Sequence, residues 1–175
     1  MRKCKVLSKN VVLIGFPNAG KSTLFNSLTG RTDSRKMPRY EKIQDMEKEI
    51  IIVDIGGISR GIARNGIYPG AHCLKYAEDF SVLAFVIALK NKTPERCIKD
   101  FSFLLEAVRS YNCGFAARKR IVILNCFSKQ CAEMDAAVCE DEMKKCFPEE
   151  IFFIVNAATG NGLLDLINWV KYNTV

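Results

Sequence analysis

Residues 11–23 constrain the fold of this chain most, because they join an apolar run to a glycine-bounded turn and then to a helical pattern. The run at residues 11–14 is typical of a buried strand. Residues 15–22 fit the spacing G-x-x-x-x-G-K-[ST], in which glycines let successive backbone N–H groups face one anion at the start of a helix. This order of strand, turn and helix predicts a layered α/β domain with a phosphate-binding loop.

Each position of the loop has a chemical role. Lys21 is expected to reach the β- and γ-phosphates as a flexible point charge, and the Ser22 hydroxyl is expected to be a ligand of Mg²⁺. The alternative is a glycine-rich turn that binds nothing, which the flanking strand and helix disfavour. The motif predicts a nucleoside triphosphate without choosing its base. The loop residues predicted to bind nucleotide are Gly15, Pro17, Asn18, Ala19, Gly20, Lys21, Ser22 and Thr23.

The length of 175 residues and the hydrophobic content of 49% predict a single domain, residues 1–175, that opens with a basic leader at residues 1–10. The net charge is +7, from 26 Lys and Arg against 19 Asp and Glu. A polyanionic partner such as RNA would explain this excess, and solvated surface charge is the alternative.

The cysteine pattern argues against disulfides and against a zinc site. There are eight cysteines, none in a Cys-x-x-Cys pair, and a single histidine, so reduced thiols of an intracellular protein are expected. Cys126 and Cys131 are expected near the pocket for the nucleotide base. No apolar run approaches the roughly 20 residues of a membrane span, and no secretory signal is visible, so we predict a soluble protein without membrane partners.

Apolar strands alternate with helical patterns along the whole chain. Such alternation is typical of a mostly parallel central sheet with helices on both faces. Residues 55–70 hold five glycines and Pro69, and we expect a long mobile loop with few contacts of its own. The expected strands are residues 11–14, 40–46 (at an edge), 49–54, 82–89, 120–124 and 151–155, and the expected helices are residues 22–28, 71–78, 94–111, 132–146 and 163–172.

Polar or glycine residues stand where several of these strands end. Ligands of open parallel sheets bind at the carboxyl ends of strands, which here are Gly15, Asp54, Asn125 and Asn156. Residues 54–57 read D-x-x-G, so Asp54 is expected to hold Mg²⁺ through water, and the N–H of Gly57 to approach the γ-phosphate. Gly57 and Lys21 are therefore the predicted catalytic residues.

The sequence resembles the Obg family within the translation-factor-related GTPases. The resemblance rests on residues 15–24 (GFPNAGKSTL), on residues 53–58 (VDIGGI, where the family has DIPGLI), on the glycine-rich residues 65–78, on Asn125, and on residues 156–163 (NAATGNGL, similar to the family's SAxTGxGL). It implies a P-loop NTPase G domain that binds GTP and GDP with Mg²⁺, using Asn125 and the backbone N–H of Ala157 at the base. It also implies work in ribosome assembly, including large-subunit assembly, with ribosomal RNA or a ribosomal subunit as partner. The location it implies is the mitochondrion, with cytoplasm or nucleolus as alternatives.

The sequence departs from the family pattern in the motif that recognises the nucleotide base and in the first switch loop. The family's N-K-x-D motif reads Asn125, Cys126, Phe127, Ser128 here. Base selection is expected to suffer, because a carboxylate–guanine pair contributes roughly 2–3 kcal/mol and a serine hydroxyl recovers part of it. The loop between Gly30 and the strand at residue 49 lacks the family's YPFTT, and its one threonine, Thr32, is poorly placed to complete a Mg²⁺ shell. The 175 residues do not contain the family's glycine-rich N-terminal domain, so any docking on ribosomal RNA that depends on that domain is not expected of them.

Ile58 stands where Ras-like enzymes carry the glutamine that orients water, so slow hydrolysis is expected. In related GTPases with an asparagine in the phosphate loop, a potassium ion substitutes for a missing catalytic cation, and Asn18 matches that asparagine; an ordinary turn residue is the alternative. The expected function is therefore a slow, Mg²⁺-dependent GTPase acting as a switch in ribosome assembly. The alternatives are a degenerate, non-hydrolysing nucleotide-binding module and an ATP-using relative from the Obg-like ATPase branch.

Overall fold

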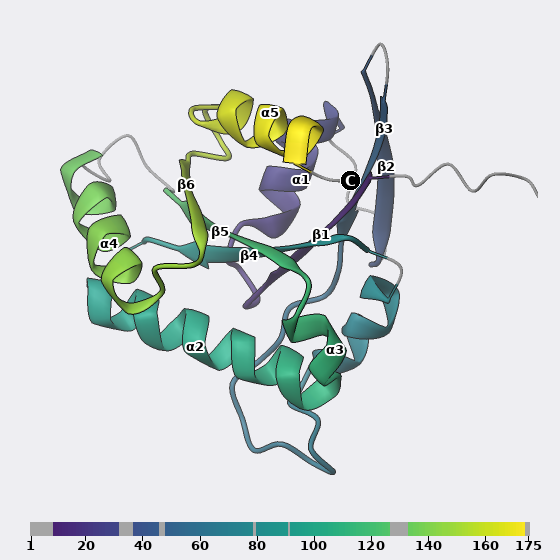
Figure 1. The fold of residues 1–175 in the computed structure, drawn as a ribbon, viewed down its shortest axis with the longest axis vertical. Helices are drawn as coiled ribbons and strands as arrows, with labels where there is room; N and C mark the ends of the chain where they lie inside the picture. Colours follow the sequence, from purple (N-terminus) through teal and green to yellow (C-terminus); the bar gives the residue numbers. More distant parts are fainter. Residues whose placement is uncertain are drawn as a thin grey trace, which may run out of the picture.

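The computed structural model describes residues 9–31, 37–45, 48–78, 80–90, 92–126 and 133–173. Within these ranges, six strands form one sheet in the order β2-β3-β1-β4-β5-β6 (Figure 1). The strands are β1 (Lys9–Gly15), β2 (Arg39–Asp45), β3 (Lys48–Asp54), β4 (Val82–Ala88), β5 (Lys119–Asn125) and β6 (Ile151–Val155). The helices are α1 (Lys21–Thr29), the 3₁₀ helix η1 (Ala71–Ala77), α2 (Pro94–Tyr111), α3 (Cys113–Ala116), α4 (Glu133–Cys146) and α5 (Leu163–Asn173).

The sheet is parallel except at one edge. β1 pairs in parallel with β3 and β4, and β5 pairs in parallel with β4 and β6. β2 runs antiparallel to β3 and forms the edge. The prediction of a mostly parallel sheet is confirmed, because strands whose residues are apolar on both faces need helices above and below.

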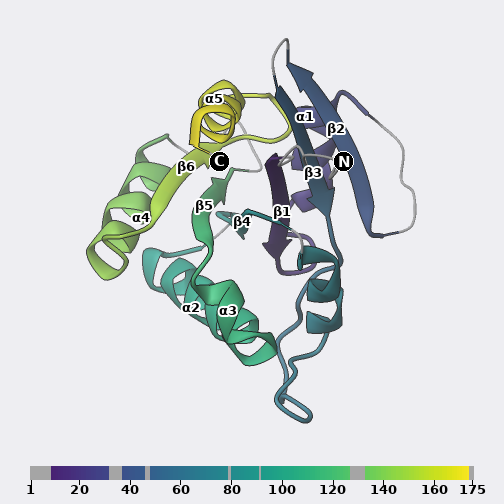
Figure 2. The same ribbon diagram turned by 45° about the vertical axis from the view of Figure 1, so that its right-hand side comes forward.

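Helices cover both faces of the sheet, and each face has its own hydrophobic core. In Figure 1, α1 and α5 lie above the sheet, and α2 and α3 lie below it. Phe25 of α1 and Leu166 of α5 belong to the core on one face. Phe101 of α2 and Met143 of α4 belong to the core on the other face, together with η1 residues such as Leu74. Figure 2 shows the segment between β3 and β4, drawn in dark teal, extending beyond the sheet next to α2 and α3.

The structure differs from the sequence prediction at several strand ends, among them β1, which begins at Lys9 inside the expected leader, and more substantially in the helices and in the segment after β3. Residues 71–77 form a 3₁₀ helix, and the four-residue α3 was not predicted. The segment at residues 55–70 has no regular strand or helix, as predicted, but the expectation that it makes few contacts is wrong. Ile55 and Ile58 are both fully buried in the core shared with α2. Glycine content predicted the irregular backbone, whereas the isoleucines between the glycines supply the packing.

Among the residues that the structure describes, none of the helices is both long enough and apolar enough to cross a membrane.

Candidate functional site

The phosphate loop lies between the end of β1 and the start of α1, as its sequence predicts. Its lysine is the first residue of α1, only 6% exposed, and donates hydrogen bonds to the carbonyl oxygens of Gly15 at 3.2 Å and Phe16 at 2.9 Å. Burial lowers the pKa of the Lys21 ammonium, and the nearby Asp54 carboxylate acts in the opposite direction. The loop therefore surrounds a buried cation whose hydrogen bonds go to backbone carbonyls.

A cavity of about 290 Å³ opens beside this loop. The turn into the helix needs a left-handed backbone at Gly20, which has φ 89° and precedes the first helical residue. Asn18 also has a positive φ of 61° and is exposed. The cavity is lined by Asn18, Gly20, Lys21, Ser22 and Thr23, all of which were predicted to bind nucleotide.

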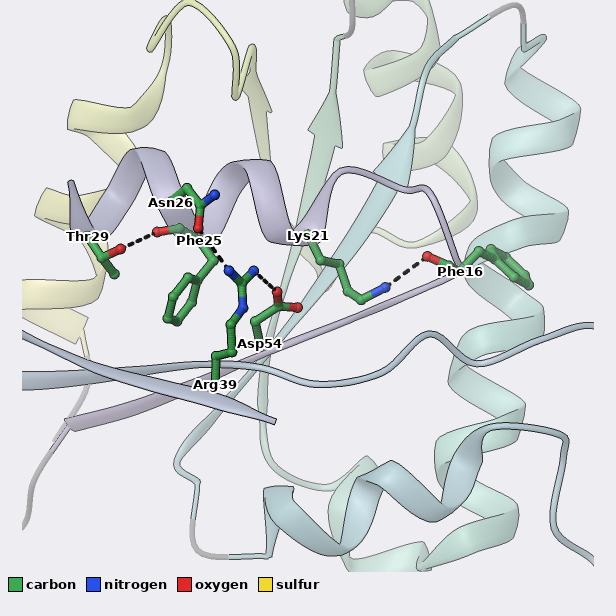
Figure 3. Close-up of polar contacts among 7 residues, drawn as sticks. All are labelled: Phe16, Lys21, Phe25, Asn26, Thr29, Arg39 and Asp54. Carbon is green, nitrogen blue, oxygen red and sulfur yellow. Dashed lines mark hydrogen bonds and ion pairs between the residues drawn. The ribbon is translucent and has the colours of Figure 1, made fainter. Parts of the chain in front are cut away.

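Asp54 ends β3 and is fully buried. Its Oδ2 forms an ion pair of 2.5 Å with Nη2 of Arg39, while its Oδ1 has no hydrogen-bond partner among the residues that the structure describes. Arg39 also donates to Oδ1 of Asn26 at 3.0 Å, and its guanidinium lies 4.6 Å from the ring centroid of Phe25 (Figure 3). Asp54, the carboxylate predicted to hold Mg²⁺, thus lies near two cationic side chains, Lys21 and Arg39.

Gly57 lies directly against the phosphate loop. A Cβ atom at this position would stand 2.5 Å from the backbone nitrogen of Pro17, so that no side chain fits between the two segments. The next residue, Ile58, donates its backbone N–H to the carbonyl of Gly15 at 3.1 Å. These contacts place the D-x-x-G segment beside the loop, as the sequence predicted, and give the glycine a packing role in addition to the predicted one.

Asn125, the last residue of β5, connects the expected pocket for the nucleotide base to the phosphate loop. Its side chain is 1% exposed and donates from Nδ2 to the carbonyl of Ala19 at 3.1 Å. Its Oδ1 accepts from the backbone N–H of Ala157 at 3.2 Å. That N–H, which the resemblance assigned to the base, is therefore engaged by Asn125 in this structure. Ser27 of α1 adds a third link, donating to the carbonyl of Ala157 at 2.5 Å.

Some predicted site residues are not placed. Thr32, Phe127, Ser128 and Cys131 lie outside the described residues. Cys126, which stands where the family has lysine, is 8% exposed, and its backbone N–H donates to the carbonyl of Val155 at 2.7 Å. Cys126, which the sequence predicted near the base pocket, is therefore buried directly after the end of β5.

Two features of the site were missed by the sequence analysis. Arg39 was not predicted as a site residue, although the pairing of Asp45 with Lys48 sets a register that puts Arg39 opposite Asp54. Arg60 lies over the ring of Phe16 at 4.7 Å and forms an ion pair with the buried Asp100 of α2. The contact between Arg39 and Asp54 could have been inferred by pairing β2 with β3 as an antiparallel hairpin. No local sequence pattern indicates the contact between Arg60 and Asp100.

Comparisons with known proteins show which family the chain resembles in sequence. Residues 10–126 match the family described as 50S ribosome-binding GTPase. The chain is 31% identical over 173 residues to GTPase Obg of Protochlamydia amoebophila and 30% identical over 181 residues to GTPase Obg of Aquifex aeolicus. These alignments cover 92% and 97% of this chain but 49% and 51% of the relatives. The chain therefore spans about half the length of the curated relatives it matches.

Solved structures show the same fold. A variant of Era from Aquifex aeolicus, bound to GDP·AlF4⁻, has a TM-score of 0.70 at 24% identity, covering 93% of this chain and 56% of that one. The FeoB G-domain of Methanococcus jannaschii has a TM-score of 0.64 at 20% identity, covering 94% and 96%. Because the family match runs from β1 through the phosphate loop and Asp54 to the end of β5, this chain belongs to the 50S ribosome-binding GTPase family, as an Obg-like P-loop G domain.

Proposed function

We propose that this chain, acting as one G domain, binds guanine nucleotide with Mg²⁺ and hydrolyses GTP slowly. The observation that carries the proposal is the buried Lys21 ammonium, which lies beside the cavity at the start of α1. Its hydrogen bonds go to neutral carbonyls, and an anionic phosphate is a stronger partner for a desolvated cation. The amide groups at the helix start add to the attraction for a phosphate.

The oxygen donors near this lysine fit Mg²⁺. This ion prefers hard oxygen ligands and keeps several of its waters. Ser22 lines the cavity, and Asp54 has one buried oxygen without a hydrogen-bond partner among the described residues. Ser22 would bind the ion directly and Asp54 through a water. When bound, the ion would neutralise charge on the phosphates.

Slow hydrolysis follows from the residues around the γ-phosphate position. Ile58 is fully buried in the core, so its side chain cannot orient an attacking water. Gly57, whose neighbour Ile58 is bonded to the phosphate loop, would supply its N–H to the phosphate. Asn18, exposed at the cavity, would hold a potassium ion, and GTP hydrolysis should then be faster in K⁺ than in Na⁺. Equal rates in both salts would contradict the potassium part of the proposal.

The decisive experiment measures affinities for GTP, ATP and XTP side by side with Mg²⁺. Lys21→Ala should remove measurable binding of all three, because the phosphate contacts carry most of the affinity when the base motif is altered. Lys99→Ala, an exposed lysine on α2, is the matched control and should bind as the wild type does. Affinity of Lys21→Ala within about threefold of wild type, a difference under about 1 kcal/mol, would show that the loop is not the site.

A non-hydrolysing binding module is the second candidate, and the buried Ile58 favours it. Single-turnover measurement with excess protein separates the two, because a binding module retains GTP unchanged over hours. An ATP-using relative is the third candidate, since Cys126 and Ser128 replace the lysine and aspartate of the base motif. Tighter binding of ATP than of GTP in the affinity experiment would support that reading.

We further propose a role in assembly of the large ribosomal subunit, in the mitochondrion or alternatively in the cytoplasm or nucleolus. The support is the family description, which names 50S ribosome binding, and the net charge of +7. Cosedimentation with large subunits should depend on the nucleotide and weaken with salt, because phosphate contacts release counterions. No cosedimentation with either GTP analogue or GDP at low salt would contradict this role. Imaging of the tagged protein tests its location.

A further inference from the structure

The ion pair between Arg39 and Asp54 joins the first residue of β2 to the last residue of β3. The two residues are directly opposite each other in the antiparallel register, so both side chains lie on the same face of the sheet. Nη2 of Arg39 is 2.5 Å from Oδ2 of Asp54, and the side chains are 6% and 0% exposed. A buried pair of this kind is costly to separate, since each charge would lose its partner in a poorly solvated place.

The guanidinium is held by more than its ion pair with the carboxylate. Besides the carboxylate, Nη1 donates to Oδ1 of Asn26 at 3.0 Å, and the group lies over the ring of Phe25 at 4.6 Å. Both of these residues belong to α1, the helix that begins at Lys21 of the phosphate loop. Arg39 therefore ties β2 and β3 to the helix that carries the phosphate site, and its geometry is set by more than the attraction of one carboxylate.

The free side of the carboxylate faces the nucleotide site. Figure 3 shows Asp54 between the guanidinium of Arg39 on one side and the Lys21 side chain on the other. Lys21 and Asp54 are close enough for the carboxylate to act on the pKa of the ammonium. The arginine takes Oδ2, and Oδ1 has no hydrogen-bond partner among the described residues. The oxygen that a metal-bound water would need is thus the one that Arg39 leaves open.

We propose that Arg39 is a positioning residue for magnesium-dependent nucleotide binding, fixing the Asp54 carboxylate with Oδ1 directed toward the phosphates. The proposal rests on the proposed function, since it assigns Asp54 to a water of Mg²⁺. Groups that hydrogen-bond a metal-site carboxylate from behind hold its orientation and typically change metal affinity tenfold or more when removed. Arg39 is the first residue of β2, the strand after the first switch loop. The contribution of Mg²⁺ to nucleotide affinity should therefore depend on the position of β2 relative to Asp54.

A competing effect has the opposite sign. A guanidinium next to the metal site repels Mg²⁺. If this repulsion were the main effect, removing the charge of Arg39 would let Mg²⁺ increase nucleotide affinity more than it does in the wild type. We expect orientation to dominate, because Arg39 is shielded by Asp54 itself, with which it forms a neutral pair, and because the contacts with Asn26 and Phe25 keep it behind the carboxylate. The sign of the change in the affinity gained with Mg²⁺ therefore decides between the two effects.

The test measures affinity for a fluorescent GDP and a non-hydrolysable GTP analogue, with Mg²⁺ and with EDTA, in wild type, Arg39→Gln and Arg39→Lys. The Mg²⁺ gain is the ratio of the two dissociation constants. Arg39→Gln should lower this gain at least fivefold while affinity in EDTA changes less than twofold, and Arg39→Lys should restore part of the gain. Arg31→Gln is the matched control, because Arg31 is exposed and forms an ion pair with Glu41 of β2. This variant should leave the Mg²⁺ gain unchanged.

Other outcomes overturn the proposal. An unchanged or larger Mg²⁺ gain in Arg39→Gln shows that the arginine is neutral or repels the metal. Equal loss of affinity with Mg²⁺ and with EDTA shows a structural role only. If Arg39→Gln does not fold, Asn26→Ala keeps both charges and removes one contact of the guanidinium, and it should lower the gain about twofold; no change in that variant also overturns the proposal. A wild-type protein that binds no nucleotide in either condition contradicts the proposed function itself, and this proposal with it.

Discussion

The side-chain amide of Asn125, at the end of β5, donates a hydrogen bond of 3.1 Å to the backbone carbonyl of Ala19 in the phosphate loop. The same side chain accepts from the N–H of Ala157, in the loop after β6. Asn125 therefore connects two loops that are far apart in the sequence, and it is 1% exposed. A residue expected from sequence to contact the base also holds the site together.

Replacing Asn125 should lower both stability and nucleotide affinity. In Asn125→Ala the carbonyl of Ala19 and the N–H of Ala157 each lose a buried partner, which costs about 2–3 kcal/mol of unfolding free energy. Affinity for GDP should fall by at least about tenfold, because the phosphate loop loses its support. Urea unfolding and fluorescence titration measure the two effects. Asn173→Ala, which removes a contact at the end of α5, is the control. Wild-type behaviour of Asn125→Ala in both assays would contradict the bridging role.

The two adjacent glycines after Asp54 should differ sharply in their tolerance of a methyl group. In Gly57→Ala the new Cβ would meet the backbone of Pro17 at 2.5 Å, so the loop must move, at a cost of about 1–3 kcal/mol and with loss of GTP affinity. In Gly56→Ala the nearest atom is Cβ of Cys73 at 3.8 Å, an ordinary contact. Thermal unfolding and GTP titration of both variants provide the comparison. Equal behaviour of the two would show that Gly57 is not pressed against the loop in solution.

Restoring the family's base motif should improve selection of guanine. The double variant Cys126→Lys and Ser128→Asp supplies the missing lysine and carboxylate, and the ratio of GTP to ATP affinity should rise at least about tenfold, on the order of 1.4 kcal/mol. Because Cys126 is only 8% exposed, the lysine should also cost stability, which Ser128→Asp alone avoids. Competition titrations measure the ratio. If it does not change in either variant, another group reads the base.

Hydrogen exchange should show a response to nucleotide in only part of residues 55–70. The N–H groups of Ile58 and Ser59 are bonded to the carbonyls of Gly15 and Pro69, so they should be protected even without nucleotide. A GTP analogue with Mg²⁺ should add protection at Gly56 and Gly57, and GDP should add much less, because only the triphosphate reaches this segment. Equal protection with both ligands would show that the protein binds nucleotide without switching.

Arg60 should restrain the same segment. It pairs with the buried Asp100 and lies over Phe16, and Asp100 is also held by Lys92 at 2.6 Å. Arg60→Gln should speed exchange at Ser59 and at neighbouring amides with and without nucleotide, because the loop loses its ion pair with α2. Arg96→Gln is the control, since Arg96 is more exposed and contacts Asp100 at 3.3 Å from within α2. Unchanged exchange in Arg60→Gln would mean that the burial of Ile55 and Ile58 alone holds the loop.

Thiol labelling should follow burial and pH. Burial raises the pKa of Cys73 to about 11 and that of Cys97 to about 12, whereas Cys113 and Cys146 are exposed. Since the thiolate is the reactive form, iodoacetamide at neutral pH should modify the exposed pair first, and labelling of Cys73 should rise about tenfold per pH unit up to its pKa. Peptide mass spectrometry follows each site. Labelling of Cys73 as fast as that of Cys113 at pH 7.5 would contradict the raised pKa of the half-buried Cys73 thiol.

The sequence by itself determined most of the strands and helices, the parallel character of the sheet and the position of the phosphate loop. Continuous apolar runs place β4 and β5 inside a parallel sheet, and the spacing of Gly15, Gly20 and Lys21 specifies the loop, because these are local patterns read over a few residues. Asp54 was placed at the site for the same reason, since it ends a buried strand.

Tertiary structure alone decided which side chains surround those local features. The pairing of Arg39 with Asp54, the contact of Arg60 with Asp100 and the bridge from Asn125 to Ala19 join residues far apart in the chain. The hairpin register between β2 and β3 hints only at the first of these contacts; the others arise because strand pairing and helix packing bring separate segments together. Burial likewise turned residues 55–70 from an expected loose loop into a partly packed one, because Ile55 and Ile58 gain more by entering the core than the surrounding glycines lose in backbone freedom.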